Sequence, residues 1–363
     1  MRLRIPDYHG TGLVNLIAEI EVRLSGWAGM PGLAEPTLIP DAGGYVLAIF
    51  DGLGVHQLGI AEASPLGAGL ATVLTAGFPT TTTTSLATVA TGQPPSVHGV
   101  IGHLLHLPGV AELVNVLKWM TPEGRPVRHD YASMLPTPNL WERLRNAGIE
   151  PITVQPGAFL DSPLSTMLYR GCRFEAIWST EELVTATVEL AAPGRLVVPY
   201  YPSVDVAAHV SGQSSVAYRR AIAEAATIWE AISARLRPDV GLVATSDHGH
   251  LDYPPETRDI IRDPHFAPLR FFGDPRSTFV AGPESLAHQL ADSTGALLVD
   301  PATFTSWLGP GLPHPDLSGR LPDWVLMAAP GRLLLPRPFD RRLIGYHGGL
   351  EPEEVEIPLL VRR

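Results

Sequence analysis

"YVLAIFDG", Tyr45 to Gly52, is the stretch on which the fold prediction depends. Six apolar or small residues are followed at once by an Asp-Gly pair. A short apolar run that ends in such a pair is typical of a buried strand followed by a turn. The stretch therefore predicts a buried strand with the carboxylate of Asp51 at its end.

Two later segments repeat this pattern of an apolar run followed by polar residues. They are "RLVVPYYPSVD", residues 195–205, and "VGLVATSDHGH", residues 240–250. Between them, apolar side chains recur at helical spacing from Ile222 to Leu236, and Pro238 then stops the predicted helix. This alternation predicts an α/β protein with a mostly parallel central sheet flanked by helices.

The carboxyl ends of the predicted strands mark the expected site. Ligands of parallel sheets bind beyond these ends, and Asp51, Asp205 and Asp247 are all placed there. The texture changes after residue 252, where prolines become frequent. We predict an α/β core from residues 1–252 and 341–363, and a small inserted α+β cap from residues 253–340.

Composition limits the classes of function. The 363 residues are 45% hydrophobic and carry a formal net charge of -11, which allows a sizeable core and argues against a nucleic-acid polymer as partner. The single cysteine, Cys172, cannot form a disulfide within the chain, which favours a reducing, cytoplasmic compartment. We expect no signal peptide, because the N-terminal stretch lacks a long apolar region, and no membrane span. Oligomeric state is not indicated.

Aspartate and histidine are paired near the ends of the predicted strands. Asp205 and His209 form D-x-x-x-H, Asp247 and His248 are adjacent, and His347 lies in "GYHGG". These side chains are the ligands of zinc and similar divalent ions, and two such ions about 4 Å apart can clamp a displacement at phosphorus. Each residue alone has an ordinary alternative as a turn or loop residue. Their joint occurrence favours a two-metal site.

The threonine tract "FPTTTTTSLATVATG", residues 78–92, also has two interpretations. Threonine favours strands and caps helices, so the tract could be structural. Alternatively, a hydroxyl held at the N-terminus of a helix that ends at Gly92 could be a nucleophile activated by a metal. The free N–H groups of the same helix terminus would stabilise a phosphoryl oxygen.

Five motifs together resemble a known family. "FDGLG", "FPTTTTTSLATVATGQPPSVHGVIGH", "YYPSVDVAAH", "SDHGH" and "GYHGG" are similar, in order, to the metal and nucleophile motifs of the alkaline phosphatase superfamily. The nucleotide pyrophosphatase/phosphodiesterase branch is the most similar, and the resemblance implies an alkaline-phosphatase-like fold for the α/β sheet. The resemblance implies two divalent metal ions, usually Zn²⁺, with Mn²⁺ as an alternative. It implies that one ion is held by Asp51, Thr82, Asp247 and His248, and the other by Asp205, His209 and His347.

The register of the tract follows from the family pattern P-T-x-T, with T-G and H-G later in the chain. It places the nucleophile at Thr82, with Thr81 and Thr83 as neighbouring alternatives. Two substrate-binding positions differ from the pattern. Thr83 stands where an aromatic residue often stacks on a nucleobase, and His103 where an asparagine often binds a phosphoryl oxygen. We expect His98 and His250 to be structural or to support the ligands.

The resemblance implies a metal-dependent phosphodiesterase or nucleotide pyrophosphatase that acts through a phospho-threonine intermediate. Its substrate would be a small-molecule nucleotide phosphodiester or pyrophosphate, including cyclic dinucleotides. Alternatives in the same superfamily are a phosphomonoesterase, a phosphonoacetate-type C–P hydrolase and a mutase. The absence of extra Arg or Lys beside the motifs favours diesters. A metal-binding or nucleotide-binding protein without turnover is the alternative of another class.

Overall fold

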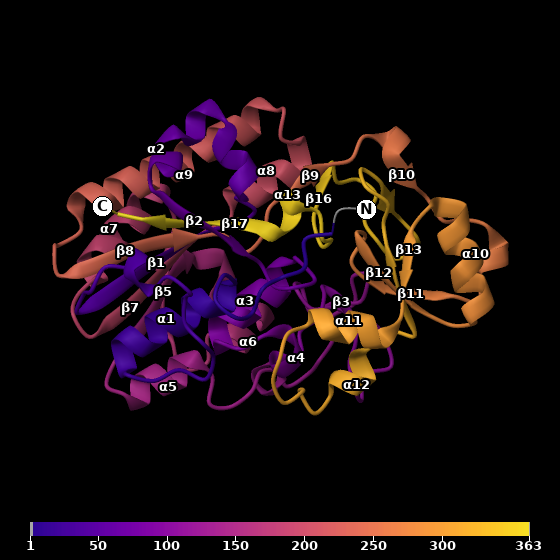
Figure 1. The fold of residues 1–363 in the computed structure, drawn as a ribbon, viewed down its shortest axis with the longest axis horizontal. Coiled ribbons are helices and arrows are strands. Elements are labelled where there is room, and N and C mark those ends of the chain that lie inside the picture. The colour runs from indigo at the N-terminus through magenta and orange to yellow at the C-terminus, as the bar shows by residue number, and fades with distance from the viewer. Residues whose placement is uncertain (1–2, 363) are drawn as a thin grey trace.

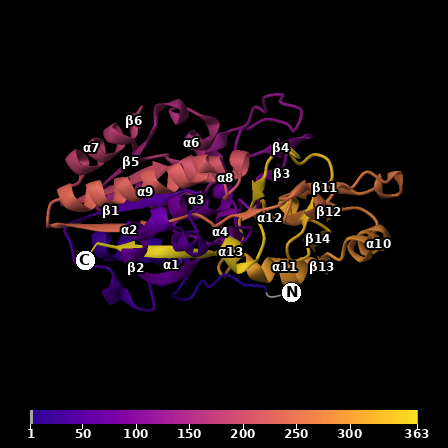
Figure 2. The same cartoon turned by 90° about the horizontal axis from the view of Figure 1, so that it is seen from above.

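The structure, a computed structural model, describes residues 3–362 and contains two main sheets at opposite ends of the long axis (Figures 1 and 2). The order of the seven-stranded main sheet is β2 (Leu70–Thr75), β17 (Glu356–Val361), β8 (Val240–Thr245), β1 (Gly44–Phe50), β7 (Arg195–Tyr201), β5 (Glu150–Pro156) and β6 (Arg173–Ile177). β1 pairs in parallel with β7 and β8, and β5 with β6 and β7, whereas β17 is antiparallel to both of its neighbours. The predicted mostly parallel central sheet is confirmed.

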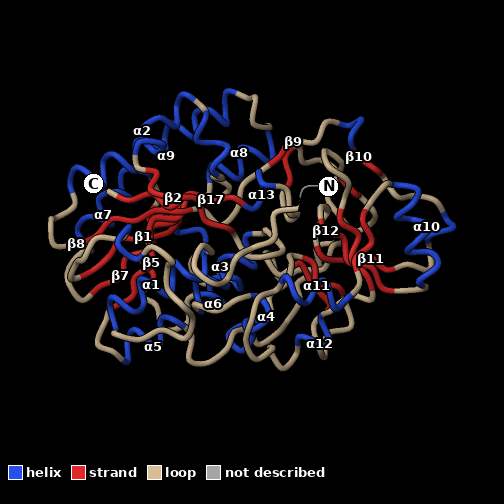
Figure 3. The backbone as a smooth tube through the Cα atoms, viewed as in Figure 1, coloured by secondary structure: helices blue, strands red, loops and turns tan. Residues whose placement is uncertain are grey.

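Helices cover both faces of the main sheet, as Figure 3 shows. Successive side chains of β1 point to opposite faces of the sheet. Tyr45, Leu47 and Ile49 belong to one hydrophobic cluster, and residues 46, 48 and 50 belong to the other. Helices of the first face are α1 (Leu13–Ser25), α3 (Thr82–Thr91), α5 (Leu140–Asn146) and α6 (Pro163–Leu168). Helices of the second face are α2 (Ser64–Ala68), α7 (Thr180–Leu190), α8 (Ser203–Ser211) and α9 (Val216–Arg235).

The helix signals of the sequence correspond to observed caps. Helix α9 begins after Ser215, whose side chain accepts a hydrogen bond from Tyr218 N, and ends three residues before Pro238. Asn139 caps α5 through Glu142 N, and Gly92 ends α3 in the left-handed conformation at φ 62°. Along residues 3–362, no helix combines the length and the apolarity that crossing a bilayer requires.

The second main sheet has six antiparallel strands. Its order is β13 (Leu297–Val299), β14 (Trp324–Met327), β12 (Ser277–Ala281), β11 (Arg270–Gly273), β3 (Leu104–His106) and β4 (Leu113–Asn115). Helices α10 (Glu284–Thr294), α11 (Pro301–Trp307) and α12 (Leu317–Arg320) accompany it. The segment predicted as a cap contributes four of these strands, and β3 and β4 join from residues 104–115, because β3 pairs with the edge of β11. The division into a core and an inserted cap stays a proposal.

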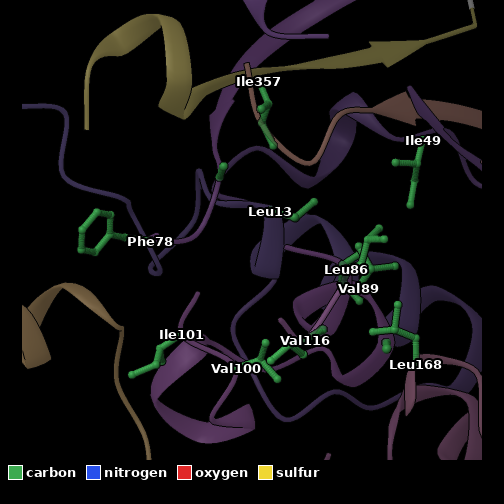
Figure 4. Packing of buried hydrophobic residues seen from close by; sticks show 14 of the residues in the cluster. Leu13, Ile49, Phe78, Leu86, Val89, Val100, Ile101, Val116, Leu168 and Ile357 are labelled. Atoms are coloured by element: carbon green, nitrogen blue, oxygen red, sulfur yellow. The ribbon is translucent and has the colours of Figure 1, made fainter. Parts of the chain in front are cut away.

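The first hydrophobic cluster continues from the main sheet into this second sheet. Figure 4 shows part of it around α3, with Leu86 and Val89 among the labelled side chains. Phe78, just before the threonine tract, packs edge to face against Phe304 and Trp307 of α11 at centroid distances of 5.8 and 5.5 Å. The tract is thereby fixed at the junction of the two sheets.

Short elements complete the fold near this junction. They are α4 (Pro95–His98), α13 (Pro352–Val355), the pair β9 (Leu251–Asp252) and β16 (Gly345–Tyr346), and the pair β10 (Arg258–Asp259) and β15 (Leu333–Leu334). The chain between β16 and α13 carries His347 back to the main sheet.

Candidate active site

The parallel strands β1 and β7 bring Asp51 and Asp205 together. Asp51 N donates to Tyr201 O, and Asp205 N donates to Asp51 O, each at 3.0 Å. Gly52 follows with φ 73°, and a Cβ atom there would lie 2.9 Å from Asp205 Cβ. The Asp-Gly pair is therefore required both by the backbone conformation and by the close approach of the second aspartate.

The first cluster consists of Asp51, Asp247 and His248, all fully or almost fully buried, with Thr82 beside it. His248 Nε2 lies 3.1 Å from Thr82 Oγ1 and 3.5 Å from both Asp51 Oδ1 and Asp247 Oδ2. Within residues 3–362, neither of these two carboxylate oxygens has a hydrogen-bond partner. Four potential ligand atoms thus face one another.

The second cluster consists of Asp205, His209, His250 and His347. Helix α8 places Asp205 and His209 one turn apart on the same face, since they are separated by four residues. Asp205 Oδ1 lies 3.4 Å from His209 Nε2, 3.1 Å from His250 Nε2 and 3.8 Å from His347 Nε2. The rings of His347 and His248 stack at a centroid distance of 3.6 Å, so the two clusters are adjacent.

Backbone carbonyls fix the tautomers of three histidines. His209 Nδ1 donates to Gly345 O at 2.8 Å, His347 Nδ1 to Thr80 O at 2.7 Å, and His248 Nδ1 to Gly249 O at 3.0 Å. Each Nε2 atom therefore carries a lone pair, as in many metal-binding histidines. His209 Nε2 and His347 Nε2 face each other at 3.2 Å without a proton between them. Two nitrogen lone pairs at this distance repel each other, and a bound cation would offset that repulsion.

The pKa shifts differ between the two clusters. Burial, together with the charges of Asp247 and Asp205, raises the pKa of Asp51 well above its usual range. Burial also acts to raise the pKa of Asp205, but its histidine neighbours outweigh this effect and lower that pKa well below its usual range. Burial and the neighbouring imidazoles lower the pKa of His347, which keeps its ring neutral. A divalent cation in the first cluster would offset the repulsion between its two carboxylates, and one in the second cluster would accept the lone pairs of its imidazoles.

Helix α3 begins at the predicted nucleophile. Thr81 is the N-cap residue in an extended conformation, and Thr82 is the first residue of the helix, with 9% of its surface exposed. Because the first N–H groups of a helix have no partner within it, this terminus favours an anion beside Thr82. Thr82 Oγ1 is thus placed between a helix terminus and the first cluster.

Thr80 connects the tract to the loop that carries His347. Its hydroxyl donates to Gly349 O at 2.9 Å and accepts from Gly348 N at 3.1 Å, while its carbonyl accepts from His347 Nδ1. Part of the threonine run is therefore structural, as the alternative interpretation of the tract allowed.

The two predicted substrate-binding residues lie at different places in the chain: Thr83 is the second residue of α3, and His103 directly precedes β3. Thr83 Oγ1 donates to Gly102 O at 3.1 Å, and its side chain is buried. His103 Nδ1 donates to Asp274 Oδ1 at 2.5 Å, and its ring lies 6.1 Å from that of Phe339. The hydroxyl of Thr83 is thus bound within the protein, whereas His103 is partly exposed; their contact with substrate stays a prediction.

Two side chains that contact the predicted ligands are not among the predicted site residues. Tyr200 OH donates to Asp51 Oδ2, and His250 Nε2 lies on Asp205 Oδ1. Alternation along the strand could have placed Tyr200 on one face of β7, but the apolar run itself does not show which tyrosine faces Asp51. The expectation that His250 supports a ligand matches its position, although its atoms also belong to the second cluster.

Comparison with known proteins identifies the family of the chain. The family model described as type I phosphodiesterase / nucleotide pyrophosphatase matches residues 66–269, more than half of the chain. The chain belongs to this family. It is a metal-dependent phosphoric ester hydrolase, and the predicted resemblance is confirmed. Among curated protein sequences, none matches the chain.

Solved structures of low sequence identity share the fold. Human ectonucleotide pyrophosphatase/phosphodiesterase 5 superposes with a TM-score of 0.67 at 16% identity, covering 88% of this chain and 87% of that one. The murine protein gives 0.66 at 17% identity over 87% of both chains, and it is also known as an inactive threonine-to-alanine variant in complex with AMP. Phosphonoacetate hydrolase from Sinorhizobium meliloti 1021, in complex with phosphonoacetate, gives 0.65 at 15% identity over 90% and 91% of the chains.

Proposed function

We propose that this protein hydrolyses a nucleotide phosphodiester or pyrophosphate through a phospho-threonine intermediate on Thr82. The observation that carries the proposal is the convergence of Thr82 Oγ1, Asp51 Oδ1, Asp247 Oδ2 and His248 Nε2 next to the second cluster. The inactive threonine-to-alanine variant of the murine neighbour, which binds AMP, supports both the nucleophile and the nucleotide.

The grouping of the donor atoms supports one assignment of residues to the two ions. Asp51, Asp247, His248 and Thr82 would hold one divalent cation, and Asp205, His209 and His347 the other, with His250 donating to Asp205. When bound, the two ions would supply Lewis acidity and neutralise charge at the reacting oxygens. The Asp and His donors suit Zn²⁺, and Mn²⁺ accepts the same set.

The residues of the chain perform the remaining tasks. Thr82 loses its hydroxyl proton to solvent, and its oxygen forms the bond to phosphorus as the bond to the leaving oxygen breaks. The leaving oxygen takes up a proton from solvent. The N-terminus of α3 stabilises a non-bridging phosphoryl oxygen, and water then cleaves the phospho-threonine to restore Thr82. His103, held by Asp274, would bind the substrate.

The test compares bis-nitrophenyl phosphate with nitrophenyl phosphate, with and without chelator. We expect faster turnover of the diester, loss of turnover with chelator, and a fall in kcat on the order of 10³-fold or more in Thr82→Ala. Thr91→Ala is the matched control at the other end of α3, where the hydroxyl donates to Ala87 O. Mass spectrometry of acid-quenched enzyme should find phosphate on Thr82. Undiminished turnover by Thr82→Ala would refute the assignment.

The phosphonate alternative uses the same site, so the assay includes phosphonoacetate. Phosphate release from phosphonoacetate without turnover of any diester would replace our assignment with a C–P hydrolase. The cytoplasmic location proposed from the single cysteine is tested separately, by fractionation of the cells that produce the protein.

A further inference from the structure

An arginine-rich pocket lies beside the second sheet, outside both clusters. It encloses about 840 Å³. We call it the arginine pocket, because its wall carries five arginines: Arg125, Arg262, Arg270, Arg337 and Arg341. Only three carboxylates, Glu112, Glu123 and Asp263, share this wall. The wall therefore has an excess of positive charge, although the formal net charge of the chain is -11. Such a local reversal of charge favours an anionic ligand.

Most of these guanidinium groups are free to bind. Arg341 donates to Leu335 O at 3.3 Å, whereas the other four have neither a carboxylate nor a hydrogen-bond partner in the described part of the chain. Some exposed arginines elsewhere are paired, such as Arg237 with Asp239 and Arg342 with Asp340, whereas Arg145 and Arg235 have no ion-pair partner in the described part of the chain. The pocket differs from these single arginines because four arginines without an ion-pair or hydrogen-bond partner line the same wall.

Aromatic rings line the same pocket. His106, Phe266 and Phe271 belong to its wall, and the ring of His106 packs edge to face on Phe272 at 5.0 Å. Burial and the nearby charge of Arg270 lower the pKa of His106, which favours a neutral, stackable ring at pH 7. A ligand with both an anionic group and a flat ring would use the two kinds of wall.

Two strands connect this pocket with the candidate active site. In the pair His103–Asp274, His103 directly precedes β3 and Asp274 directly follows β11. From that pair, the pocket residue His106 is three positions along β3, and Arg270 is four positions along β11. At ~3.3 Å per residue, the pocket lies roughly 10–13 Å from the pair. Phe339, which packs near His103, directly follows the pocket residues 337–338.

We propose that the arginine pocket binds the distal nucleotide portion of an extended substrate, with its phosphate on the arginines and its base against the aromatic rings. This inference rests on the proposed function and deepens it. It also supplies a contact for the base that Thr83 lacks, because Thr83 is not aromatic and its hydroxyl is bound to Gly102 O. The substrate class is a nucleotide diester or pyrophosphate that carries further phosphate beyond the bond that is cleaved.

The kinetic test uses the double variant Arg270→Ala/Arg337→Ala. Its substrates are a dinucleoside tetraphosphate and bis-nitrophenyl phosphate, which is too short to reach the pocket. We expect the ratio of kcat/KM for the long substrate over the short one to fall about tenfold, since one charged pair is worth about that factor. The double variant Arg145→Ala/Arg235→Ala, which removes two exposed arginines elsewhere, should keep the ratio. An unchanged ratio in the pocket variant would overturn the inference.

A binding test separates this inference from the proposed function. Naphthalene disulfonate, an aromatic dianion without phosphorus, should bind the wild-type enzyme and lose about tenfold in affinity in the pocket variant but not in the control. Arg270→Lys/Arg337→Lys should recover part of that affinity. Diester turnover with equal probe binding by wild type and pocket variant would refute the pocket and leave the function standing. Weakened probe binding without any diester turnover would refute the function and leave the anion pocket standing.

Discussion

Tyr200 orients a carboxylate of the first cluster through a single hydroxyl. Its OH donates to Asp51 Oδ2, which leaves Asp51 Oδ1 facing His248 Nε2. Burial and the charge of Asp51 raise the pKa of Tyr200 well above its usual range, so the phenol remains a donor. Hydrogen bonds of this kind hold ligating carboxylates in place.

Tyr200→Phe should therefore lower the affinity for divalent cation about tenfold, the lower end of the usual effect of such supporting residues. Competition with a chromophoric chelator measures that affinity. Tyr201→Phe is the matched control, because the neighbouring phenol donates instead to Glu224 Oε2 at 2.7 Å. Equal affinities for the Tyr200→Phe and Tyr201→Phe proteins would argue against this role.

His98 is a buried structural histidine with a consequence for pH dependence. Val100 N donates to its Nδ1 and its Nε2 donates to Thr88 Oγ1, each at 3.1 Å. Burial lowers the pKa of His98 to about 3, from 6.5 in the unfolded chain. Below pH 6.5 the unfolded state therefore takes up a proton that the folded state refuses, so stability falls with falling pH until the folded pKa is reached.

Between pH 6.5 and pH 5, this residue should cost about 2 kcal/mol of the free energy of unfolding. His98→Gln keeps a polar side chain but does not titrate, so its stability should decline less over that interval. Urea unfolding of both proteins at the two pH values gives the difference. Parallel declines would show that His98 does not contribute.

At the scale of elements, the loop between β16 and α13 depends on a buried ion pair. Arg276 Nε lies 3.2 Å from Glu354 Oε1, and the same oxygen accepts from Gly349 N at 3.0 Å. Ser277, beside Arg276, donates to Gly348 O at 2.7 Å. The second sheet thereby helps to hold the loop that carries His347.

Arg276→Met should destabilise the fold by about 3–5 kcal/mol, because it leaves the carboxylate of Glu354 buried without its cation. Adding Glu354→Gln removes that charge while keeping an acceptor for Gly349 N, and should restore part of the loss. Thermal unfolding of the two single variants and the double variant measures the coupling. Strict additivity of the two substitutions would contradict the proposed dependence.

The elements also show where sequence reasoning succeeds and where it stops. Apolar runs with an aspartate after them identified β1, β7 and β8, because strands of a parallel sheet are buried on both faces. The sequence pattern predicts D-x-x-x-H at the end of a strand and does not predict helix α8. In the structure both residues lie in α8, which brings Asp205 and His209 to the same face of the helix. The recruitment of β3 and β4 depends on an edge pairing with β11, and no local pattern encodes such a distant partner.

At the scale of the whole molecule, the site is a meeting of segments that are remote in sequence. Motif order and the resemblance allowed the grouping of Asp51, Asp247 and His248, and of Asp205, His209 and His347, to be predicted. The supporting contacts of Tyr200, Thr80 and Glu354 could not be predicted, because they depend on tertiary contacts rather than on the spacing of residues in the sequence.

Bound metal should stabilise the whole fold. Chelation would leave the buried carboxylates of both clusters without counter-charge, so the melting temperature should fall. At a free metal concentration of 100 Kd, the bound ion contributes about 2.7 kcal/mol per site. Calorimetry with chelator, and again after Zn²⁺ is restored, measures the change. A melting temperature that is independent of chelator would contradict metal binding by the folded state.

The central claim is that two divalent cations occupy the two clusters, with Thr82 at the first of them. Anomalous diffraction at the zinc absorption edge, from crystals grown with Zn²⁺, tests it most directly. We predict two peaks about 4 Å apart, one among Asp51, Asp247, His248 and Thr82, the other among Asp205, His209 and His347. A single peak, or peaks away from these side chains, would contradict the account.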